Sequence, residues 1–284
     1  MSSWPLEKFD ENGFAVIENF FTDNETIEMH KAGLELCMNA PESDRKVFNA
    51  ASNRIEATHT KEIYFIESSN KIHYFYENDA LDANGDLIVD KMQSLNKVGH
   101  ALHVLHPIFK KYTFDQRIKN VAKHLGMIKP VIPQSMFIYK NPKIGAEVKP
   151  HQDATYLYTD PISITGFWIP TEDATPENGC LWFVKGSHKH GLDRRMIRSP
   201  DKTSNELLIY DKPEVKYSQD QFVACPAKKG SLVIIHGLVV HQSEWNRSDK
   251  SRFAYTFHVM ETENVKYSPE NWLQLPEGET FPEL

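Results

Sequence analysis

From Pro130 onward the chain is a series of short segments rich in β-branched and aromatic residues, separated by turn signals. The turns include Asn141-Pro142, Asn178-Gly179 and the polar tetrapeptide at 246–249. This alternation is typical of short antiparallel strands, and many such strands in one chain favour a sandwich or a jelly-roll barrel. The predicted strands cover residues 131–139, 162–169, 181–184, 231–236 and 252–260.

The first half of the chain has a mainly helical pattern. One early strand is expected at 13–17, followed by a helix over 27–38 that Asp23 or Asn24 can cap. Apolar residues at three- and four-residue spacing predict a second helical stretch over 87–111. A third helix is expected from Thr113, with Asp115 in its first turn, to Gly126. The apolar residues that define the second stretch are Leu95, Val98, Leu102 and Leu105.

Helices first and strands later predict an α+β fold with a mainly β core, in which the N-terminal helices buttress the barrel. No repeat, low-complexity tract or linker divides the chain, so a single domain over residues 1–284 is expected. The cysteines Cys37, Cys180 and Cys225 form no CxxC pair, and we expect them to be buried thiols rather than metal or redox ligands.

The composition narrows the classes of partner. A formal net charge of -7 argues against nucleic acid, because phosphate binding requires a basic face. No run of 18 apolar residues is present, so no membrane span is expected. The N-terminus resembles neither a secretory signal nor a transit peptide, and the final residues are not a peroxisomal address of the SKL type, so a cytoplasmic location is expected.

The triplet His151-Gln152-Asp153 is the first candidate for chemistry. On a strand, residues i and i+2 point to the same face, so the imidazole and the carboxylate could bind one ion. With His241 as a third ligand, the set would be the facial triad of non-haem Fe(II) oxygenases, which leaves positions for a 2-oxo acid and O2. The triplet alone is weak evidence, because such a pattern is expected about once by chance, and by itself it favours a surface histidine and aspartate near a turn.

The segment after His241 strengthens the hypothesis. A polar turn follows this histidine, and Arg252 then opens the next predicted strand. On a hairpin, Arg252 and Ser243 could lie side by side near the metal. A guanidinium fork with a hydroxyl is suited to the far carboxylate of a chelated dicarboxylate. The alternative for Arg252 is a surface charge on an edge strand.

Three blocks together resemble the phytanoyl-CoA dioxygenase family of Fe(II)- and 2-oxoglutarate-dependent oxygenases, and the likeness extends from about Gly13 to about Met260. The middle block is similar to the family pattern NGCLWF-x-PGSH, with Lys185 in place of the proline. The blocks are His151-Gln152-Asp153, the ENGCLWFVKGSH segment at 177–188, and His241-Gln242-Ser243 with 246–249 and Arg252.

The resemblance implies a double-stranded β-helix, a jelly-roll of the cupin-like type, in which His151, Asp153 and His241 bind iron. It implies that Arg252 and Ser243 take the far carboxylate of 2-oxoglutarate. The further positions that match the family's co-substrate pocket are Lys97, Met136, Gln152 and Trp168. Taken alone, Lys97 could equally be a solvated lysine in a helical stretch, and Met136 and Trp168 could be core residues.

Other histidines in the sequence are also candidates for metal ligands. His236 closes an apolar run and is expected to be a buried, hydrogen-bonded core residue. Histidines at 100, 103 and 106 would spiral around a helix and could not all meet one ion, so a helix face with scattered histidines is expected. His188 and His190 belong to the signature segment, near the expected mouth of the pocket.

These features predict a dioxygenase that uses Fe(II), 2-oxoglutarate and O2, with ascorbate as a candidate reductant, to hydroxylate a small molecule and release succinate and CO2. Asp153 occupies the place where related halogenases have a small residue, which favours hydroxylation. Acyl-CoA or another lipid-like substrate, together with a peroxisomal location, is the alternative that the family implies. A non-catalytic metal-binding module and a zinc-binding barrel are the alternatives from other classes.

Overall fold

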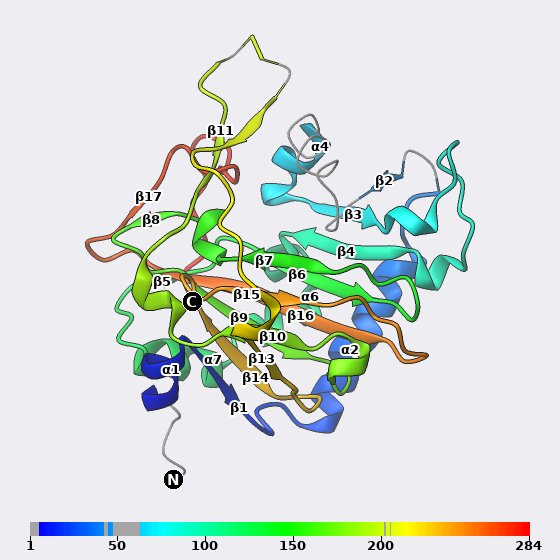
Figure 1. Cartoon of the computed structure of the whole chain (residues 1–284), viewed down its shortest axis with the longest axis horizontal. Coiled ribbons are helices and arrows are strands. Elements are labelled where there is room, and N and C mark those ends of the chain that lie inside the picture. Colours follow the sequence, from blue (N-terminus) through cyan, green and yellow to red (C-terminus); the bar gives the residue numbers. More distant parts are fainter. Residues whose placement is uncertain (1–5, 43–44, 48–62, 202, 205) are drawn as a thin grey trace.

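The computed structural model describes residues 6–42, 45–47, 63–201, 203–204 and 206–284. Their core is a pair of mainly antiparallel sheets, one of nine strands and one of four (Figure 1). The large sheet contains, in spatial order, β1 (Phe14–Ile17), β14 (Leu232–His236), β9 (Thr165–Pro170), β16 (Arg252–Glu261), β6 (Ser135–Lys140), β4 (Leu95–His100), β3 (Ile72–Tyr76) and β2 (Lys46–Val47), with β5 (Pro130–Val131) on β16.

The small sheet lies over one half of the large one. In spatial order it contains β13 (Phe222–Cys225), β10 (Leu181–Val184), β15 (His241–Ser243) and β7 (Val148–His151). Two further strand pairs lie outside these sheets, β11 (Met196–Arg198) with β12 (Leu208–Tyr210) and β8 (Thr159–Asp160) with β17 (Lys266–Tyr267). Two facing sheets with this connectivity confirm the predicted jelly-roll.

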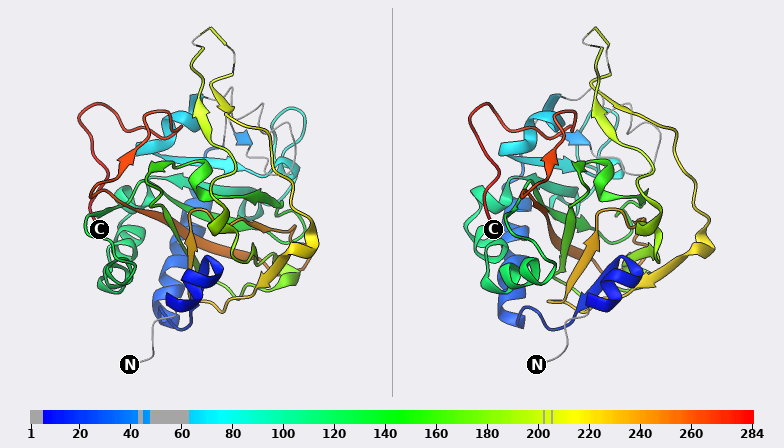
Figure 2. Two further views of the ribbon diagram at one scale, coloured as in Figure 1. Left: turned by 60° about the vertical axis from the view of Figure 1, so that its left-hand side comes forward. Right: turned by 90° about the vertical axis from the view of Figure 1, so that its left-hand side faces the viewer.

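Helices cover the outer face of the large sheet (Figures 1 and 2). The helices are α1 (Leu6–Asn12), α2 (Asp23–Met38), α4 (Ile63–Ile66), α5 (Leu102–Leu105), α6 (Pro107–Thr113) and α7 (Gln116–His124). Of these, α1, α2, α5, α6 and α7 contribute to the main hydrophobic cluster together with the outward-facing side chains of the sheet, whereas α4 packs in a second cluster. Each helix in the described part of the chain is too short or too polar to cross a bilayer.

Strand β16 separates the core from the interior of the barrel. Its odd-numbered residues, including Phe253, Tyr255 and Phe257, pack in the cluster under the helices. Its even-numbered residues, including Arg252 and His258, line a cavity between the two sheets. Successive strand residues point to opposite faces. The aromatic residues of β16 therefore pack against the helices, and the polar residues between them point into the cavity.

The close approach of α2 to β6 depends on Gly33. A Cβ atom at this position would lie 2.2 Å from the ring of Phe137. The hydroxyl of Tyr139, also on β6, donates to the carbonyl of Gly33 at 2.6 Å. The helix therefore fixes the strand whose opposite face carries Met136 and Lys140 toward the cavity.

We expect Gly33→Ala to destabilise the protein by about 1–3 kcal/mol through overpacking, although alanine favours a helix more than glycine does. Chemical denaturation followed by far-UV circular dichroism measures the change. Lys31→Ala on the exposed face of α2 is the matched control and should change the free energy of unfolding by less than about 0.5 kcal/mol. A more stable Gly33→Ala protein would contradict this packing.

Most sequence-based expectations for the fold are confirmed. The six predicted strands at 13–17, 131–139, 162–169, 181–184, 231–236 and 252–260 correspond to β1, β5 with β6, β9, β10, β14 and β16. Asp115 caps α7 by accepting from the backbone N–H of Arg117. The cap of α2 is different from the expected one, because Thr22 rather than Asp23 or Asn24 forms a capping box with Glu25. All three cysteines are buried free thiols.

The predicted helical stretch over 87–111 is wrong in its central part, where residues Leu95–His100 form strand β4. All six residues of β4 are buried, because it lies between β3 and β6 and is covered on both faces. A strand buried on both faces has no polar alternation, so its apolar spacing can match a helical pattern by chance. Before β4 the only helical element of the stretch is a 3-10 turn at Lys91–Gln93, and after it the chain forms the short helices α5 and α6.

The three histidines of this stretch therefore do not share a helix surface. His100 on β4 is buried, and its Nδ1 lies 2.6 Å from the hydroxyl of Ser68. His103 in α5 is also buried, with its Nδ1 2.8 Å from the hydroxyl of Ser135. His106 precedes α6 at its N-cap position. The expected helix face with scattered histidines is wrong, since two of the three are packed inside the protein.

Candidate active site

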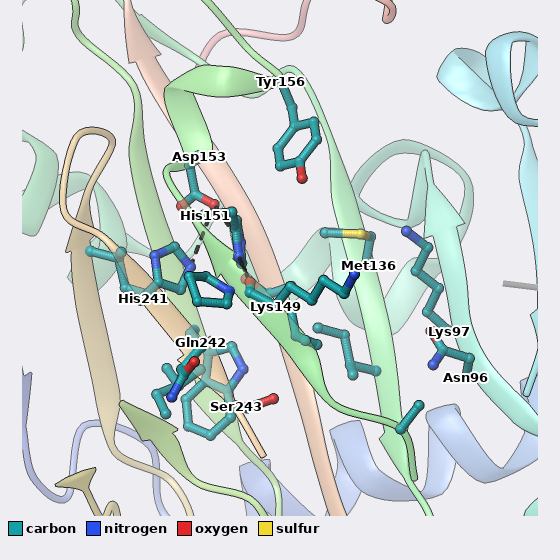
Figure 3. A pocket seen from close by; sticks show the side chains of 18 of the residues that line it. Asn96, Lys97, Met136, Lys149, His151, Asp153, Tyr156, His241, Gln242 and Ser243 are labelled. Atoms are coloured by element: carbon teal, nitrogen blue, oxygen red, sulfur yellow. Dashed lines mark hydrogen bonds and ion pairs between the residues drawn. The ribbon is translucent and has the colours of Figure 1, made fainter. Parts of the chain in front are cut away.

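His151, Asp153 and His241 lie together in the interior of the barrel (Figure 3). One donor atom from each residue lies within 4.8 Å of the other two, a spacing that could hold a metal ion. His151 and His241 face each other directly across the pairing of β7 with β15. Asp153 does not continue the strand as expected, because β7 ends at His151 and Asp153 opens a 3-10 turn.

The hydrogen bonds of the two imidazoles fix which nitrogen faces the cluster. The Nδ1 of His151 lies 2.8 Å from the carbonyl of Lys149, and the Nδ1 of His241 lies 3.1 Å from the carbonyl of Val239. Carbonyl oxygens only accept, so each Nδ1 donates, and each ring directs its Nε2 toward the cluster. Burial lowers the pKa of His151 to about 4, which keeps this ring neutral.

The carboxylate of Asp153 lies between the two rings. Its Oδ1 is 3.7 Å from the Nε2 of His151 and 3.6 Å from the Nε2 of His241. Burial raises the pKa of Asp153, but the surrounding histidines outweigh that effect and hold its pKa below the ordinary value. Two imidazole lone pairs and one ionised carboxylate fit a divalent ion of the facial-triad type, with open positions toward the cavity.

His258 on β16 also contacts this cluster, and sequence reasoning missed it. Its Nε2 lies 3.2 Å from Oδ2 of Asp153, the oxygen that is not shared with the other two histidines. The amide nitrogen of Gln134 lies 3.1 Å from Nδ1 of His258. If Gln134 donates to Nδ1, Nε2 carries the proton and donates to Asp153. The sequence signal that could have revealed His258 is its even spacing from Arg252 on one predicted strand. This spacing places both side chains on the same face of the strand.

Replacing His258 with phenylalanine should lower metal affinity by roughly 10–100-fold, because partners that orient a metal-ligating carboxylate typically have effects of this size. Anaerobic titration with Fe(II), or with Mn(II) as a stable substitute, measures the affinity. His190→Phe, at an exposed position, is the control. Unchanged metal affinity in His258→Phe would show that Asp153 is held by other contacts.

A cavity of about 260 Å³ extends from this cluster between the two sheets. Most of the residues that the sequence assigns to the co-substrate pocket line it, and they come from four strands of the large sheet and one of the small sheet. The predicted site residues that line the cavity are His151, Asp153, His241, Arg252, Ser243, Lys97, Met136 and Trp168. The strand pairing therefore brings together residues that are as far apart in the sequence as Lys97 and Arg252.

Gln152 is the exception among the predicted pocket residues. Its buried side chain points away from the cavity and donates to the carbonyls of Gly191 and Leu238 at 2.9 and 2.8 Å. Its side-chain oxygen accepts from the backbone N–H of Asp193 at 2.8 Å. Gln152 therefore links the loops that contain Gly191, Asp193 and Leu238 through hydrogen bonds. It does not reach a position where it could contact a co-substrate.

Arg252 lines the same cavity but is set apart from the ligand cluster along β16: it begins this strand, whereas His258, which contacts Asp153, lies six residues further along. The side chain of Arg252 is 1% exposed, and its Nε donates to the carbonyl of Gly179 at 2.9 Å. Its Nη1 is buried without a hydrogen-bond partner among the described residues. Its guanidinium carbon lies 5.3 Å from the ring centre of Trp168. A buried guanidinium with unused donors is costly unless an anion pairs with it, so this part of the cavity is suited to a carboxylate.

The expected hairpin between Ser243 and Arg252 is wrong, although both residues reach the same cavity. Ser243 ends β15 in the small sheet, whereas Arg252 begins β16 in the large sheet. The turn between them crosses from one sheet to the other. The hydroxyl of Ser243 accepts from the ammonium of Lys140 at 2.8 Å, and Lys140 is a second buried cavity residue that sequence reasoning missed.

Lys97 lies on β4 opposite Ile138 of β6, not on a solvated helix as one alternative had it. Its ammonium lies 5.5 and 5.4 Å from the ring centres of Phe65 and Phe75. Burial lowers the pKa of Lys97 to about 7. A lysine in this state can gain a proton when an anion binds nearby, which suits a position in an anion-binding cavity.

The remaining candidate histidines lie outside the cavity. His236 is half-buried and accepts from the backbone N–H of Leu238, in agreement with a hydrogen-bonded structural role. His188 packs against His236 with ring centres 5.0 Å apart, and His190 is exposed. Neither His188 nor His190 lines the cavity, so their expected place at its mouth is wrong.

Comparison with known sequences gives matches over nearly the whole chain. A sequence model described as phytanoyl-CoA dioxygenase (PhyH) matches residues 9–254. The chain is 46% identical over 282 residues to phytanoyl-CoA dioxygenase domain-containing protein 1 of Danio rerio, covering 98% of this chain and 97% of that protein. It is 43% identical over 269 residues to a phytanoyl-CoA dioxygenase of Arabidopsis thaliana, covering 95% and 92%. These matches agree with the family resemblance of the three sequence blocks.

Solved structures of non-haem α-ketoglutarate-dependent enzymes share the fold. The carbocyclase SnoK of nogalamycin biosynthesis matches with a TM-score of 0.62 at 21% identity, covering 95% of this chain and 87% of that chain. The epimerase SnoN, in complex with Fe3+, α-ketoglutarate and nogalamycin RO, matches with a TM-score of 0.63 at 14% identity, covering 97% and 90%. EvdO2 of Micromonospora carbonacea, complexed with 2-oxoglutarate, matches at 0.59 and 17%, covering 97% and 98%.

Proposed function

The chain belongs to the phytanoyl-CoA dioxygenase family and is a 2-oxoglutarate-dependent dioxygenase, and on this premise we propose that it hydroxylates a small molecule with iron held by His151, Asp153 and His241. In this reaction one oxygen atom of O2 enters 2-oxoglutarate, which leaves as succinate and CO2, and the other becomes the hydroxyl oxygen of the product. Bound iron supplies the O2 chemistry, and the protein positions the reactants and excludes water.

One observation carries the proposal: the cavity is lined by a metal-ligand cluster and, set apart from it, by a buried Arg252 with unused donors. A 2-oxo dicarboxylate carries matching groups at its two ends. Its 2-oxo acid end would bind the metal, while Arg252 and Ser243 would bind its far carboxylate. Trp168 would form a wall of the subsite, and Lys97 with Met136 would complete the pocket beside the chelating end.

The substrate would occupy the part of the cavity that this co-substrate leaves open. Its wall is aromatic, and Phe65 and Trp272 stack there with ring centres 4.3 Å apart. Lys149 precedes His151 by two residues, and its side chain extends along the cavity toward Met136 (Figure 3). No ion pair among the described residues involves Lys149. We propose a small substrate with an apolar body and an anionic group, which includes both free carboxylic acids and acyl-CoA thioesters.

The test is succinate formation from 2-oxoglutarate with Fe(II) and ascorbate under air. We expect turnover that EDTA and anaerobic conditions both abolish, and that increases when a substrate is present. A panel of free aromatic and aliphatic acids, their neutral amides and a branched acyl-CoA distinguishes the substrate classes. Stimulation by the acyl-CoA alone would favour the thioester reaction of the family's namesake. A protein that binds Zn(II) but neither binds nor turns over 2-oxoglutarate would be a metal-binding module instead.

A further inference from the structure

Lys140 is a buried cation that the proposed reaction does not yet use. It ends strand β6, is 2% exposed, and lines the cavity on the same face as Met136. Its ammonium is surrounded by three oxygen atoms, the carbonyl of Ala146 at 2.6 Å, the hydroxyl of Ser243 at 2.8 Å and the carbonyl of Glu244 at 3.0 Å.

The hydrogen bonds of Lys140 determine the direction of the Ser243 hydroxyl. Two of the three oxygens around the ammonium are carbonyls, which only accept, and a lysine ammonium has three hydrogens to donate. The third hydrogen then goes to Ser243 Oγ, so Ser243 accepts from Lys140 and retains its own hydrogen. That hydrogen is available to an acceptor in the cavity, such as a carboxylate oxygen.

Lys140 also places a second positive charge beside Arg252. The two residues are directly opposite each other in the pairing of β6 with β16. Like charges at such positions repel, and here both side chains are buried, so the arrangement is unfavourable without an anion. Burial, and to a smaller extent Arg252, hold the pKa of Lys140 well below its ordinary value, although Glu77 acts in the opposite direction. A carboxylate that binds between Arg252 and Ser243 would likewise favour the ammonium.

Glu77 provides a counter-charge behind this pair. It is 1% exposed, and its carboxylate accepts from the backbone N–H of Ala146 at 3.2 Å, the residue whose carbonyl accepts from Lys140. Burial raises the pKa of Glu77 to about 7. With Glu77 and Lys140 both ionised, the polar group has one buried carboxylate and two buried cations. An incoming carboxylate would balance the second cation.

We propose that Lys140 is a positioning residue that makes Ser243 a hydrogen-bond donor and, with Arg252, selects co-substrates with a far carboxylate. The inference rests on the proposed function, since it assumes that 2-oxoglutarate binds in this cavity. It adds a selectivity for the co-substrate that depends on the far carboxylate and not on the atoms that bind the metal. Lys140 would favour 2-oxo dicarboxylates over 2-oxo monocarboxylates of equal length.

Binding of two ligands to the Fe(II)-loaded protein, measured anaerobically by calorimetry, tests this role. The ligands are 2-oxoglutarate and 2-oxopentanoate, which has a methyl group in place of the far carboxylate. Lys140→Met should weaken 2-oxoglutarate binding by about 10–100-fold, the range for a lost hydrogen bond that involves a charge. Binding of 2-oxopentanoate should stay within about twofold. Lys143→Met, exposed on the adjacent turn, is the control and should change neither affinity.

A double-mutant cycle with Ser243→Ala tests whether Lys140 acts through Ser243. In the Ser243→Ala background, Lys140→Met should have a clearly smaller effect on 2-oxoglutarate binding than it has in the wild type. If Lys140→Met is too unstable to purify, the charge-balanced variant Lys140→Met/Glu77→Gln serves for the same comparison.

Two results would lead to different conclusions. Equal weakening of both ligands by Lys140→Met, or no weakening of either, would overturn the role of Lys140 in selectivity. A wild-type protein that binds the two ligands with equal affinity would instead contradict the proposed carboxylate subsite at Arg252. The failure of the inference and the failure of the proposed function are therefore distinguishable.

Discussion

The variant His241→Ala is expected to lose metal binding and 2-oxoglutarate turnover together. His241 is 5% exposed, and its Nε2 is one of only three donors in the cluster. Partners that merely orient a ligand already have effects of roughly 10–100-fold, so loss of a direct ligand should lower metal affinity by more than about 100-fold. Turnover should fall to the level of the EDTA-treated wild type, because only two of the three candidate ligands then remain.

Metal content after anaerobic loading and succinate formation are the two measurements for this variant. His190→Ala is the control, because His190 is exposed and does not line the cavity. Circular dichroism shows whether the fold is retained. A folded His241→Ala protein that keeps one equivalent of iron and normal turnover would show that the metal lies elsewhere.

The variant Arg252→Met is expected to lose affinity for 2-oxoglutarate while its free energy of unfolding changes little. Removing one partner of a buried, hydrogen-bonded charge pair typically costs 2–5 kcal/mol, so 2-oxoglutarate affinity should fall by at least about 30-fold. Without ligand, the same change removes a buried charge opposite Lys140. Replacing a buried charge by an apolar side chain is often neutral, so the free energy of unfolding should change by less than about 2 kcal/mol.

Arg252→Lys examines the geometry of this contact. A lysine keeps the charge but cannot form two parallel hydrogen bonds with a carboxylate, so the affinity should be intermediate. Arg247→Met, in the same segment but exposed, should behave as the wild type. Calorimetric titration with 2-oxoglutarate and thermal denaturation without it measure the two effects. An Arg252→Met protein with wild-type affinity would contradict the carboxylate subsite.

The sequence was sufficient for the features that depend on local pattern or on a family motif. The β-branched and aromatic residues of 252–260, which follow a polar turn, predicted a strand there, and β16 covers Arg252–Glu261. The separated motifs predicted His151, Asp153 and His241 as one cluster, and the donor atoms do lie within 4.8 Å of one another. Their assignment as iron ligands stays a prediction that the experiments above test.

Other features required the tertiary structure. Strand β4 is buried on both faces, so its sequence lacks the alternation that distinguishes a strand from a buried helix. Gln152 lies between two candidate ligands in the sequence, yet the turn after β7 directs its side chain away from them. Local spacing does not define which way a residue points once the regular strand has ended.

His151, Asp153 and His241, together with Ser243 and Arg252, could be predicted from the sequence because they stand at the positions of family motifs. His258 and Lys140 could not, because each acts through a contact with a distant part of the chain. His258 contacts Asp153 and Lys140 donates to Ser243 across distant segments of the chain, and Lys140 faces Arg252 in the register in which β6 pairs with β16. That register depends on packing of the whole sheet against α2 and its neighbours, a long-range property that no local sequence window contains.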